Sequence, residues 1–276
     1  MRCETLYLKD FFPQLGENGC NATLATYLPE PMTEMGWEDR KSPCIVICPG
    51  GGYSGVSQRE GEPIALKFLE AGYHVFVVTY SVAPHRFPQQ LLEVAAAMEL
   101  IHQNADRWHC DVDKVAITGF SAGGHLAAHY SNAYDCPEVR AVFPDSKPVQ
   151  LSILCYPVIT SDRAYAHQGS FNNLLGEYPA DDDTRFSCNE LVSEKTPPAF
   201  LWHTAEDACV PVENSLLYAM ALKKYKIPFE LHVYPFGWHG LSTVDGMTNE
   251  EAALTVGVRR ANEWLENVKR WLKCYW

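Results

Sequence analysis

Short, continuous runs of apolar residues recur along this chain, and polar segments rich in glycine and proline separate them. The run Cys44–Cys48 is fully apolar, and mostly apolar segments of similar length are His74–Thr79, Val115–Thr118, Leu151–Cys155 and Ala199–His203. An apolar run of this length without alternation is typical of a strand that is buried on both faces of a mainly parallel sheet. We therefore predict a central, mainly parallel sheet. Phe229–Tyr234 favours a further strand, and Thr5–Leu8 and Ala22–Leu28 favour two strands at the edge.

Segments with helical periodicity lie between these strands. Phe87–Trp108 carries apolar residues every three or four positions, so it predicts a long helix with one apolar face. The chain closes on a second amphipathic segment, in which the apolar positions run from Leu254 to Leu272. Shorter helices are expected over Pro63–Glu70 and Val212–Tyr225. Strands that alternate with helices predict an α/β fold with helices on both faces of the sheet.

Residues from about Thr160 to Thr196 interrupt this alternation. They are polar and rich in turn residues, and they include the acidic cluster Asp181-Asp182-Asp183. A segment of about 37 residues is too short to form a core of its own. We therefore predict one domain over residues 1–276, with residues 160–196 inserted in it as a small cap or lid.

A glycine pattern, Gly119-x-Ser121-x-Gly123, follows the Val115–Thr118 run and precedes a run of helix formers. A strand, a tight turn and a helix in this order are the context of a nucleophile elbow. Such a turn strains the backbone of the serine, and side chains at the two glycines would collide with adjoining chain. We predict that Ser121 is a nucleophile at the N-terminus of a helix, where N–H groups favour negative charge.

A serine hydroxyl needs a base within hydrogen-bond distance, and the base needs a third group that holds its tautomer. In an open α/β sheet, functional loops gather at the carboxyl ends of the strands. His239 lies between Gly237 and Gly240 in the loop after the last strand, and it is the predicted base. Three other histidines fit less well. His203 ends a strand, His232 lies within a strand, and His125 follows the serine by one helical turn.

Asp207 is the predicted orienting acid, because it lies shortly after the Ala199–His203 strand. We interpret the adjacent Glu206 as a solvated neighbour, and Asp162, which follows an earlier strand, is the alternative acid. The order of Ser121, Asp207 and His239 along the chain is the order found in α/β-hydrolases.

The sequence Pro49-Gly50-Gly51-Gly52-Tyr53 follows the Cys44–Cys48 strand directly. Glycines without a Cβ allow backbone N–H groups to point into a site, and Ala122 supplies another N–H directly after the nucleophile. We therefore predict an oxyanion hole formed by Gly51, Gly52 and Ala122. A phosphate-binding loop is the alternative, but the sequence contains neither G-x-G-x-x-G nor G-K-[ST].

Composition limits the partners. The formal net charge of −12 argues against nucleic acid and anionic membranes, since both require a basic face. No run approaches the roughly 18 apolar residues of a membrane span. The N-terminal residues lack the pattern of a signal peptide. We expect no nucleic-acid or membrane partner, and self-association into a homo-oligomer is compatible with the sequence.

The ten cysteines are spread singly along the chain, with no C-x-x-C and no Cys/His pair at the spacing of a zinc site. We interpret them as small, buried, apolar residues in a reducing compartment, which favours the cytoplasm. The predicted chemistry requires neither a metal ion nor an organic cofactor.

Four motifs carry a family resemblance over roughly residues 40 to 245. They are P-G-G-G-Y at Pro49–Tyr53, G-F-S-A-G-G-H-L-A at Gly119–Ala127, W-H-T-x-x-D-x-x-V-P at Trp202–Pro211, and His239-Gly240. Together they resemble the α/β-hydrolase esterases, in particular bacterial acetylesterases and acetyl-xylan-esterase-like proteins. The hormone-sensitive-lipase branch has a histidine before its glycines, where this chain has Pro49.

The resemblance implies a serine carboxylester hydrolase that removes short acyl groups, acetyl above all, from carbohydrate esters such as acetylated xylo-oligosaccharides. The same resemblance allows feruloyl esters as alternative substrates. Tyr53 and Trp238 are the candidate substrate-binding residues, because either ring could stack on a sugar or line an acyl pocket, with ordinary packing as the alternative. Two other functions stay open: an amide hydrolase, either a peptidase or an arylformamidase, with the same triad, and a non-catalytic receptor for small molecules.

Overall fold

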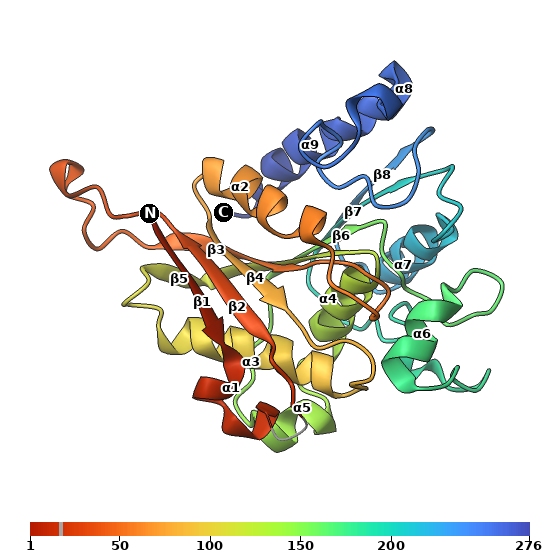
Figure 1. Ribbon diagram of the computed structural model, residues 1–276, viewed down its shortest axis with the longest axis horizontal. Coiled ribbons are helices and arrows are strands. Elements are labelled where there is room, and N and C mark those ends of the chain that lie inside the picture. The colour runs from red at the N-terminus through yellow and green to blue at the C-terminus, as the bar shows by residue number, and fades with distance from the viewer. Residues whose placement is uncertain (17–18) are drawn as a thin grey trace.

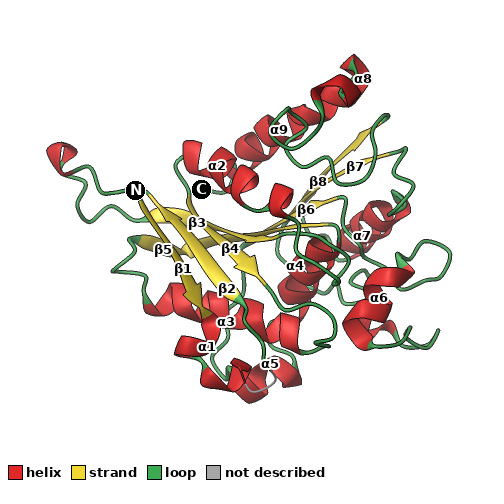
Figure 2. Cartoon of the chain, in the orientation of Figure 1, coloured by secondary structure: helices red, strands yellow, loops and turns green. Residues whose placement is uncertain are grey.

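Eight strands form one sheet in the computed structural model, which describes residues 1–16 and 19–276 (Figures 1 and 2). They are β1 (Arg2–Tyr7), β2 (Thr23–Leu28), β3 (Ser42–Cys48), β4 (His74–Thr79), β5 (Cys110–Phe120), β6 (Leu151–Cys155), β7 (Ala199–Thr204) and β8 (Phe229–Tyr234). Their order across the sheet is β1-β2-β4-β3-β5-β6-β7-β8. The pairs β1–β2 and β2–β4 are antiparallel, and the other neighbouring strands are parallel. The predicted mainly parallel sheet is confirmed.

Helices cover both faces of this sheet, as the alternating pattern predicted (Figure 1). They are α1 (Leu8–Phe11), α2 (Glu62–Glu70), α3 (Gln89–Gln103), α4 (Ala122–Ala133), α5 (Pro137–Val142), α6 (Gln168–Leu175), α7 (Glu213–Lys224), α8 (Val256–Arg259) and α9 (Glu263–Leu272). Short 3-10 segments are η1 (Pro13–Gly16), η2 (Thr33–Met35), η3 (Gln58–Glu60), η4 (Thr184–Phe186), η5 (Glu251–Ala253) and η6 (Arg260–Asn262). The helices α2 and α9 lie on one face, and α3, α4 and α7 lie on the other.

The alternation of side chains along β3 shows how the sheet divides the interior into two cores. Cys44 and Cys48 point into the core beneath α3 and α4, whereas Ile45 and Ile47 point into the core beneath α2 and α9. Because successive side chains on a strand point to opposite faces, a run with no polar residue buries both faces. All ten cysteines lie among the described residues as free thiols, and six of them are buried.

The second core contains a stack of aromatic rings. Trp264 of α9 lies parallel to Trp202 of β7, with ring centroids 5.2 Å apart and an angle of 17° between the planes. Both side chains are fully buried, and the indole N–H of Trp264 donates a hydrogen bond to the carbonyl oxygen of Ser242 at 3.0 Å. The C-terminal helix is therefore attached both to the sheet and to the loop that follows His239.

Some boundaries differ from the prediction. The helix expected over Phe87–Trp108 is α3, which covers only Gln89–Gln103, with Pro88 at its N-cap and Asn104 at its C-cap. The amphipathic segment after Leu254 is divided into η5, α8, η6 and α9 rather than one helix. The second predicted edge strand, β2, lies between β1 and β4 and is not an edge.

Residues 160–196, the predicted cap, contain α6 and η4, and α6 was not expected from the sequence. Phe171 and Leu174 of α6 are buried in the core that also contains α3 and α4. None of the helices in residues 1–16 and 19–276 combines the length and the apolar character that crossing a membrane requires.

Replacing Trp264 with alanine should lower the free energy of unfolding by about 3–5 kcal/mol, because it leaves a cavity against Trp202. Phenylalanine at this position should cost less, since it refills most of the volume and loses only the hydrogen bond to Ser242. Denaturant unfolding measures both values. Trp37→Ala is the control, because this tryptophan is 38% exposed and the change should stay within about 0.5 kcal/mol. Equal losses at the two positions would contradict the role assigned to the stack.

Candidate active site

Ser121 stands in the sharp turn between β5 and α4. Its φ of 54° and ψ of −121° place a non-glycine residue in a strained region of backbone conformation. Neighbouring loops hold this conformation: the Ser121 N–H donates to the carbonyl oxygen of Cys155 at 3.0 Å, and the Ser121 carbonyl accepts from Val158 at 3.0 Å. This is the geometry that the glycine pattern predicted for a nucleophile elbow.

The two glycines of the motif have no room for a side chain. A Cβ at Gly119 would lie 2.1 Å from the carbonyl oxygen of Gly123, and a Cβ at Gly123 would lie 2.1 Å from that of Cys48. These neighbours are backbone atoms, which cannot swing away as a flexible side chain can. Close approach of three chain segments therefore requires glycine at both positions.

The structure brings the three predicted catalytic side chains into one hydrogen-bonded chain. Nε2 of His239 lies 2.7 Å from Oγ of Ser121, and Nδ1 of His239 lies 2.6 Å from Oδ2 of Asp207. The three residues come from the loops after β5, β7 and β8, which meet at the carboxyl ends of these parallel strands. Both distances lie within ordinary hydrogen-bond range, so a proton can move from serine to imidazole without rearrangement.

The surroundings of Asp207 favour its ionised form. Burial by itself would raise the pKa of this carboxyl, but hydrogen bonds from His203 and His239 and the Val210 N–H outweigh it, and the net pKa lies well below the usual range. The other oxygen, Oδ1, accepts the N–H groups of Cys209 and Val210 at 2.9 Å each. An ionised carboxylate keeps the proton of His239 on Nδ1, which leaves Nε2 free to accept the serine proton.

The alternatives that the sequence left open lie elsewhere. His203 is buried, with Nδ1 2.8 Å from the Ser215 hydroxyl and Nε2 2.9 Å from the carbonyl oxygen of Val210. Its Nε2 also lies 3.4 Å from Asp207, so His203 contacts the acid rather than the serine. Glu206 accepts the Gly237 N–H at 3.2 Å and so fastens the histidine loop, a contact that the solvated interpretation missed.

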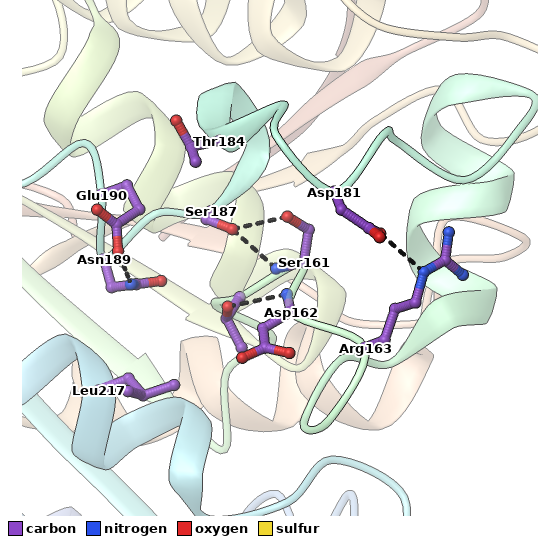
Figure 3. A pocket seen from close by; sticks show the side chains of 10 residues that line it. Ser161, Asp162, Arg163, Asp181, Thr184, Ser187, Asn189, Glu190 and Leu217 are labelled. Atoms are coloured by element: carbon purple, nitrogen blue, oxygen red, sulfur yellow. Dashed lines mark hydrogen bonds and ion pairs between the residues drawn. The ribbon is translucent and has the colours of Figure 1, made fainter.

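Asp162, the alternative acid, lines a separate polar cavity of about 480 Å³ with Ser161, Ser187 and Leu217 (Figure 3). Its Oδ1 accepts the Ala164 N–H at 3.0 Å and closes a turn of its own chain. The partner of His239 is Asp207 and not Asp162.

The glycine loop after β3 adopts a conformation that few other residues tolerate. Gly51 has a φ of 127° and Gly52 a φ of 62°, and a Cβ at Gly51 would lie 2.2 Å from the carbonyl oxygen of Gly55. Among the hydrogen bonds between described residues, none uses the N–H of Gly51, Gly52 or Ala122 as the donor. These three backbone N–H groups are therefore not used by the described residues, and their role as an oxyanion hole stays a prediction.

The two candidate substrate-binding aromatics lie in different surroundings. Tyr53 is only 1% exposed, and its hydroxyl lies 2.8 Å from Nδ1 of His125. A ring buried in this way offers no face to a sugar, so the expectation that Tyr53 contacts substrate is wrong for this structure. Trp238 is 39% exposed and lines a hollow of about 520 Å³ with Arg59 and Asn249, next to His239 in sequence. Its role in substrate binding stays a prediction.

Sequence reasoning missed two side chains of the cap segment that reach the glycine loop. Asn173 donates from its side-chain amide to the Gly52 carbonyl at 2.9 Å. His167 lies close enough that a Cβ at Gly52 would be 3.7 Å from its ring carbon Cε1. Burial, and then the positive charge of a protonated His239, lower the pKa of His167. No local pattern around either residue indicated these contacts, because they depend on how α6 packs.

Within the described part of the chain, no group of three or more His, Cys, Asp or Glu side chains is arranged to hold a metal ion.

Comparison with known proteins places the chain in a family. The profile of the BD-FAE family matches residues 32–222, which is more than half of the chain. The chain belongs to the BD-FAE family. The triad residues Ser121 and Asp207 lie inside the matched region, and His239 follows it.

Two curated relatives of this BD-FAE chain are larger proteins. Endo-1,4-beta-xylanase B of Butyrivibrio fibrisolvens is 39% identical over 231 residues, which cover 79% of this chain and 35% of the relative. The acetylxylan esterase of Xylanibacter ruminicola is 32% identical over 238 residues, which cover 84% of this chain and 46% of the relative. The BD-FAE chain thus spans less than half of the length of either relative.

Solved structures match over nearly the whole chain. An acetyl ester-xyloside bifunctional hydrolase from Caldicellulosiruptor lactoaceticus has a TM-score of 0.84 at 35% identity, covering 99% of this chain and 96% of that protein. A carboxylesterase from Lactobacillus plantarum WCFS1 has a TM-score of 0.83 at 27% identity, covering 99% and 97%. The predicted α/β-hydrolase fold, and membership in a family with acetylesterase and acetylxylan esterase relatives, are confirmed.

Gly123→Ala should lower the free energy of unfolding of the BD-FAE chain by about 2–3 kcal/mol or prevent folding, because the new Cβ would overlap backbone carbonyls. Gly55→Ala is the matched control, since no atom lies within 4 Å of a Cβ built at that glycine. Denaturant unfolding of both variants measures the difference. Equal unfolding free energies of the two variants would show that α4 can move away from the end of β3 without loss of stability.

His129 offers a test of burial beneath the cap segment. Burial, and then repulsion from His125, lower the pKa of His129 to about 3. An unfolded histidine has a pKa near 6.5, so between about pH 6 and pH 4 only the unfolded chain binds this proton, and stability falls as the pH falls. In His129→Phe, the slope of unfolding free energy against pH in this window should be smaller by about 1.4 kcal/mol per pH unit. Equal slopes in variant and parent would show that this histidine titrates normally.

Proposed function

We propose that this chain is a serine carboxylester hydrolase that removes short acyl groups, acetyl above all, from carbohydrate esters such as acetylated xylo-oligosaccharides. The observation that carries the proposal is the continuous hydrogen-bonded chain from Ser121 through His239 to Asp207, together with backbone N–H groups to which the described residues offer no acceptor. A nucleophile, a base, an orienting acid and oxyanion donors are the full set that acyl transfer requires.

The proposed mechanism has two steps. Nε2 of His239 takes the Ser121 proton as Oγ attacks the ester carbonyl, and the resulting oxyanion is stabilised by the N–H groups of Gly51, Gly52 and Ala122. The alcohol leaves with a proton from His239. Water, activated by the same imidazole, then releases the acid from the acyl-enzyme on Ser121, and the ionised Asp207 stabilises the imidazolium in both steps.

The substrate class rests on the character of the surroundings and on the relatives. The side chains next to the glycine loop and the histidine include His167, Trp238 and Arg59, a mixture of polar groups and one half-exposed aromatic ring. Hydrogen-bonding groups with an aromatic face suit a sugar better than a long lipid chain. The relatives named acetylxylan esterase and acetyl ester-xyloside hydrolase support the same class.

An amide hydrolase with the same triad is the second candidate. The acylamino-acid-releasing enzyme 1 of Oryza sativa is 27% identical over 257 residues, which cover 84% of this chain and 31% of that protein. The triad itself does not distinguish esters from amides, because both reactions pass through a tetrahedral oxyanion.

A substrate panel tests the proposal. The purified chain should hydrolyse p-nitrophenyl acetate and acetylated xylo-oligosaccharides, with lower kcat/KM for butyryl, feruloyl, acylamino-acid and formamide substrates. Ser121→Ala should lower kcat on acetyl esters by at least about 10,000-fold, because the triad acts as a unit. Initial rates, with folding of the variant checked by circular dichroism, measure both.

Faster turnover of amides than of esters would replace the ester proposal with the amide one. Hydrolysis that survives in Ser121→Ala would exclude the proposed nucleophile. An absence of hydrolysis of every acyl substrate would favour the non-catalytic receptor.

A further inference from the structure

The carboxyl group of Glu60 is buried between the loops of the candidate site. Glu60 ends η3 and is 3% exposed. Within the described residues, no lysine, arginine or histidine forms an ion pair with it. Burying a carboxyl group is costly unless hydrogen bonds compensate, so its contacts have to account for its position.

Each oxygen of this carboxyl accepts a hydrogen bond from a different loop. Oε2 accepts the backbone N–H of Gly50 at 2.8 Å, and Oε1 accepts the hydroxyl of Tyr156 at 2.8 Å. A Cβ at Gly50 would lie 2.7 Å from Oε2, so the carboxyl occupies the space that a side chain there would need. Glu60 therefore holds Gly50, the first glycine of the glycine loop, close to the residue that follows β6.

Tyr156 in turn connects Glu60 to the loop that carries His239. The Tyr156 oxygen accepts the backbone N–H of Ser242 at 3.0 Å, and the Ser242 hydroxyl donates to the carbonyl oxygen of Arg59, the residue before Glu60. The Tyr156 ring also meets the His239 ring edge to face, with centroids 5.1 Å apart. Burial, and then the negative charge of Glu60, raise the pKa of Tyr156, so its hydroxyl stays protonated and able to donate.

Strain in the backbone agrees with this anchoring. Tyr156 has a φ of 36° and Ser242 a φ of 53°, and neither is a glycine. Non-glycine residues stay in this region only where surrounding contacts hold them. Both of these residues are fastened through the network that begins at Glu60.

We propose that Glu60 is a positioning residue that sets the oxyanion loop and the loop of His239 relative to one another through Gly50, Tyr156 and Ser242. Gly50 directly precedes the two predicted oxyanion donors, and Ser242 lies three residues after the predicted base. An oxyanion donor acts only at about 2.7–3.1 Å from the oxyanion, and a misplacement of about 1 Å can cost about 100-fold in rate. This inference rests on the proposed acyl transfer at Ser121.

Three variants test it with p-nitrophenyl acetate. Glu60→Ala should lower kcat by about 100-fold with KM changed less than about 3-fold, because the loops shift while the binding surface remains. Glu60→Gln should lose less, about 10-fold, since its carbonyl oxygen still accepts from Gly50 while its amide cannot accept the Tyr156 proton. Tyr156→Phe should lose about 10-fold as well.

A double variant shows whether Glu60 and Tyr156 act through one network or independently of each other. If Glu60 and Tyr156 act as one unit, Glu60→Ala with Tyr156→Phe should lose little more than Glu60→Ala alone. Glu62→Gln is the matched control, because this nearby glutamate is exposed and should keep kcat within about 2-fold. Circular dichroism and thermal unfolding establish that each variant is folded, and Glu60→Gln serves if Glu60→Ala fails to fold.

Reaction of Ser121 with a fluorophosphonate gives a readout that needs no turnover. Its second-order rate should fall across the variants in the order found for kcat, since attack on phosphorus uses the same base and oxyanion donors. If the parent protein reacts with the fluorophosphonate but hydrolyses no ester, the proposed function fails, and these rates still decide the role of Glu60. Folded Glu60 variants with parental rates, a rise in KM alone, or multiplying losses in the double variant would overturn the inference.

Discussion

The close approach of α4 to the end of β3 is the constraint on which the candidate site depends. A Cβ at Gly123 would lie 2.1 Å from the carbonyl oxygen of Cys48 and 2.3 Å from that of Pro49, so the helix reaches this position only because the residue has no side chain. This contact brings the N-terminus of α4, and with it the Ala122 N–H, to the strand end from which the glycine loop leaves. The Ser121 hydroxyl and the predicted oxyanion donor at Ala122 therefore lie at the end of the sheet from which the glycine loop leaves.

The order of the strands in the sheet brings the acid, the imidazole and the hydroxyl of the site together. Because β7 and β8 are neighbours and both point the same way as β5, the loops that carry Asp207 and His239 emerge at the same edge as Ser121. The acid is buried but surrounded by N–H donors from its own turn and by two imidazoles. A charge held in this way is stabilised by fixed dipoles rather than by water, and in the proposed mechanism these dipoles need no reorganisation when His239 gains a proton.

Rigid strands alone do not place a catalytic loop to within an ångström. Hydrogen bonds between polar groups connect the glycine loop, the turn after β6 and the loop after His239. Apolar contacts would fix these loops less well, because a hydrogen bond specifies both distance and direction. Glu60, Tyr156 and Ser242 form this connection on one side, and Asn173 of α6 fastens Gly52 on the other. The segment predicted to be a cap thus contacts the loop that would bind the oxyanion.

Features that depend on neighbours in the chain were predictable from the sequence. The continuous apolar run of β3 and the mostly apolar segments of β4 and β6 indicated buried strands, because burial on both faces disfavours polar residues. The glycines around Ser121 indicated the strained turn, because only glycine tolerates the contact. Features that depend on distant segments were not. The sequence could not show that Tyr53 is buried against His125, that α6 brings His167 and Asn173 to the glycine loop, or that Glu60 lies between two loops. Local propensity reports what a segment prefers by itself, whereas these positions follow from how the helices pack on the sheet, and only the tertiary structure decides that.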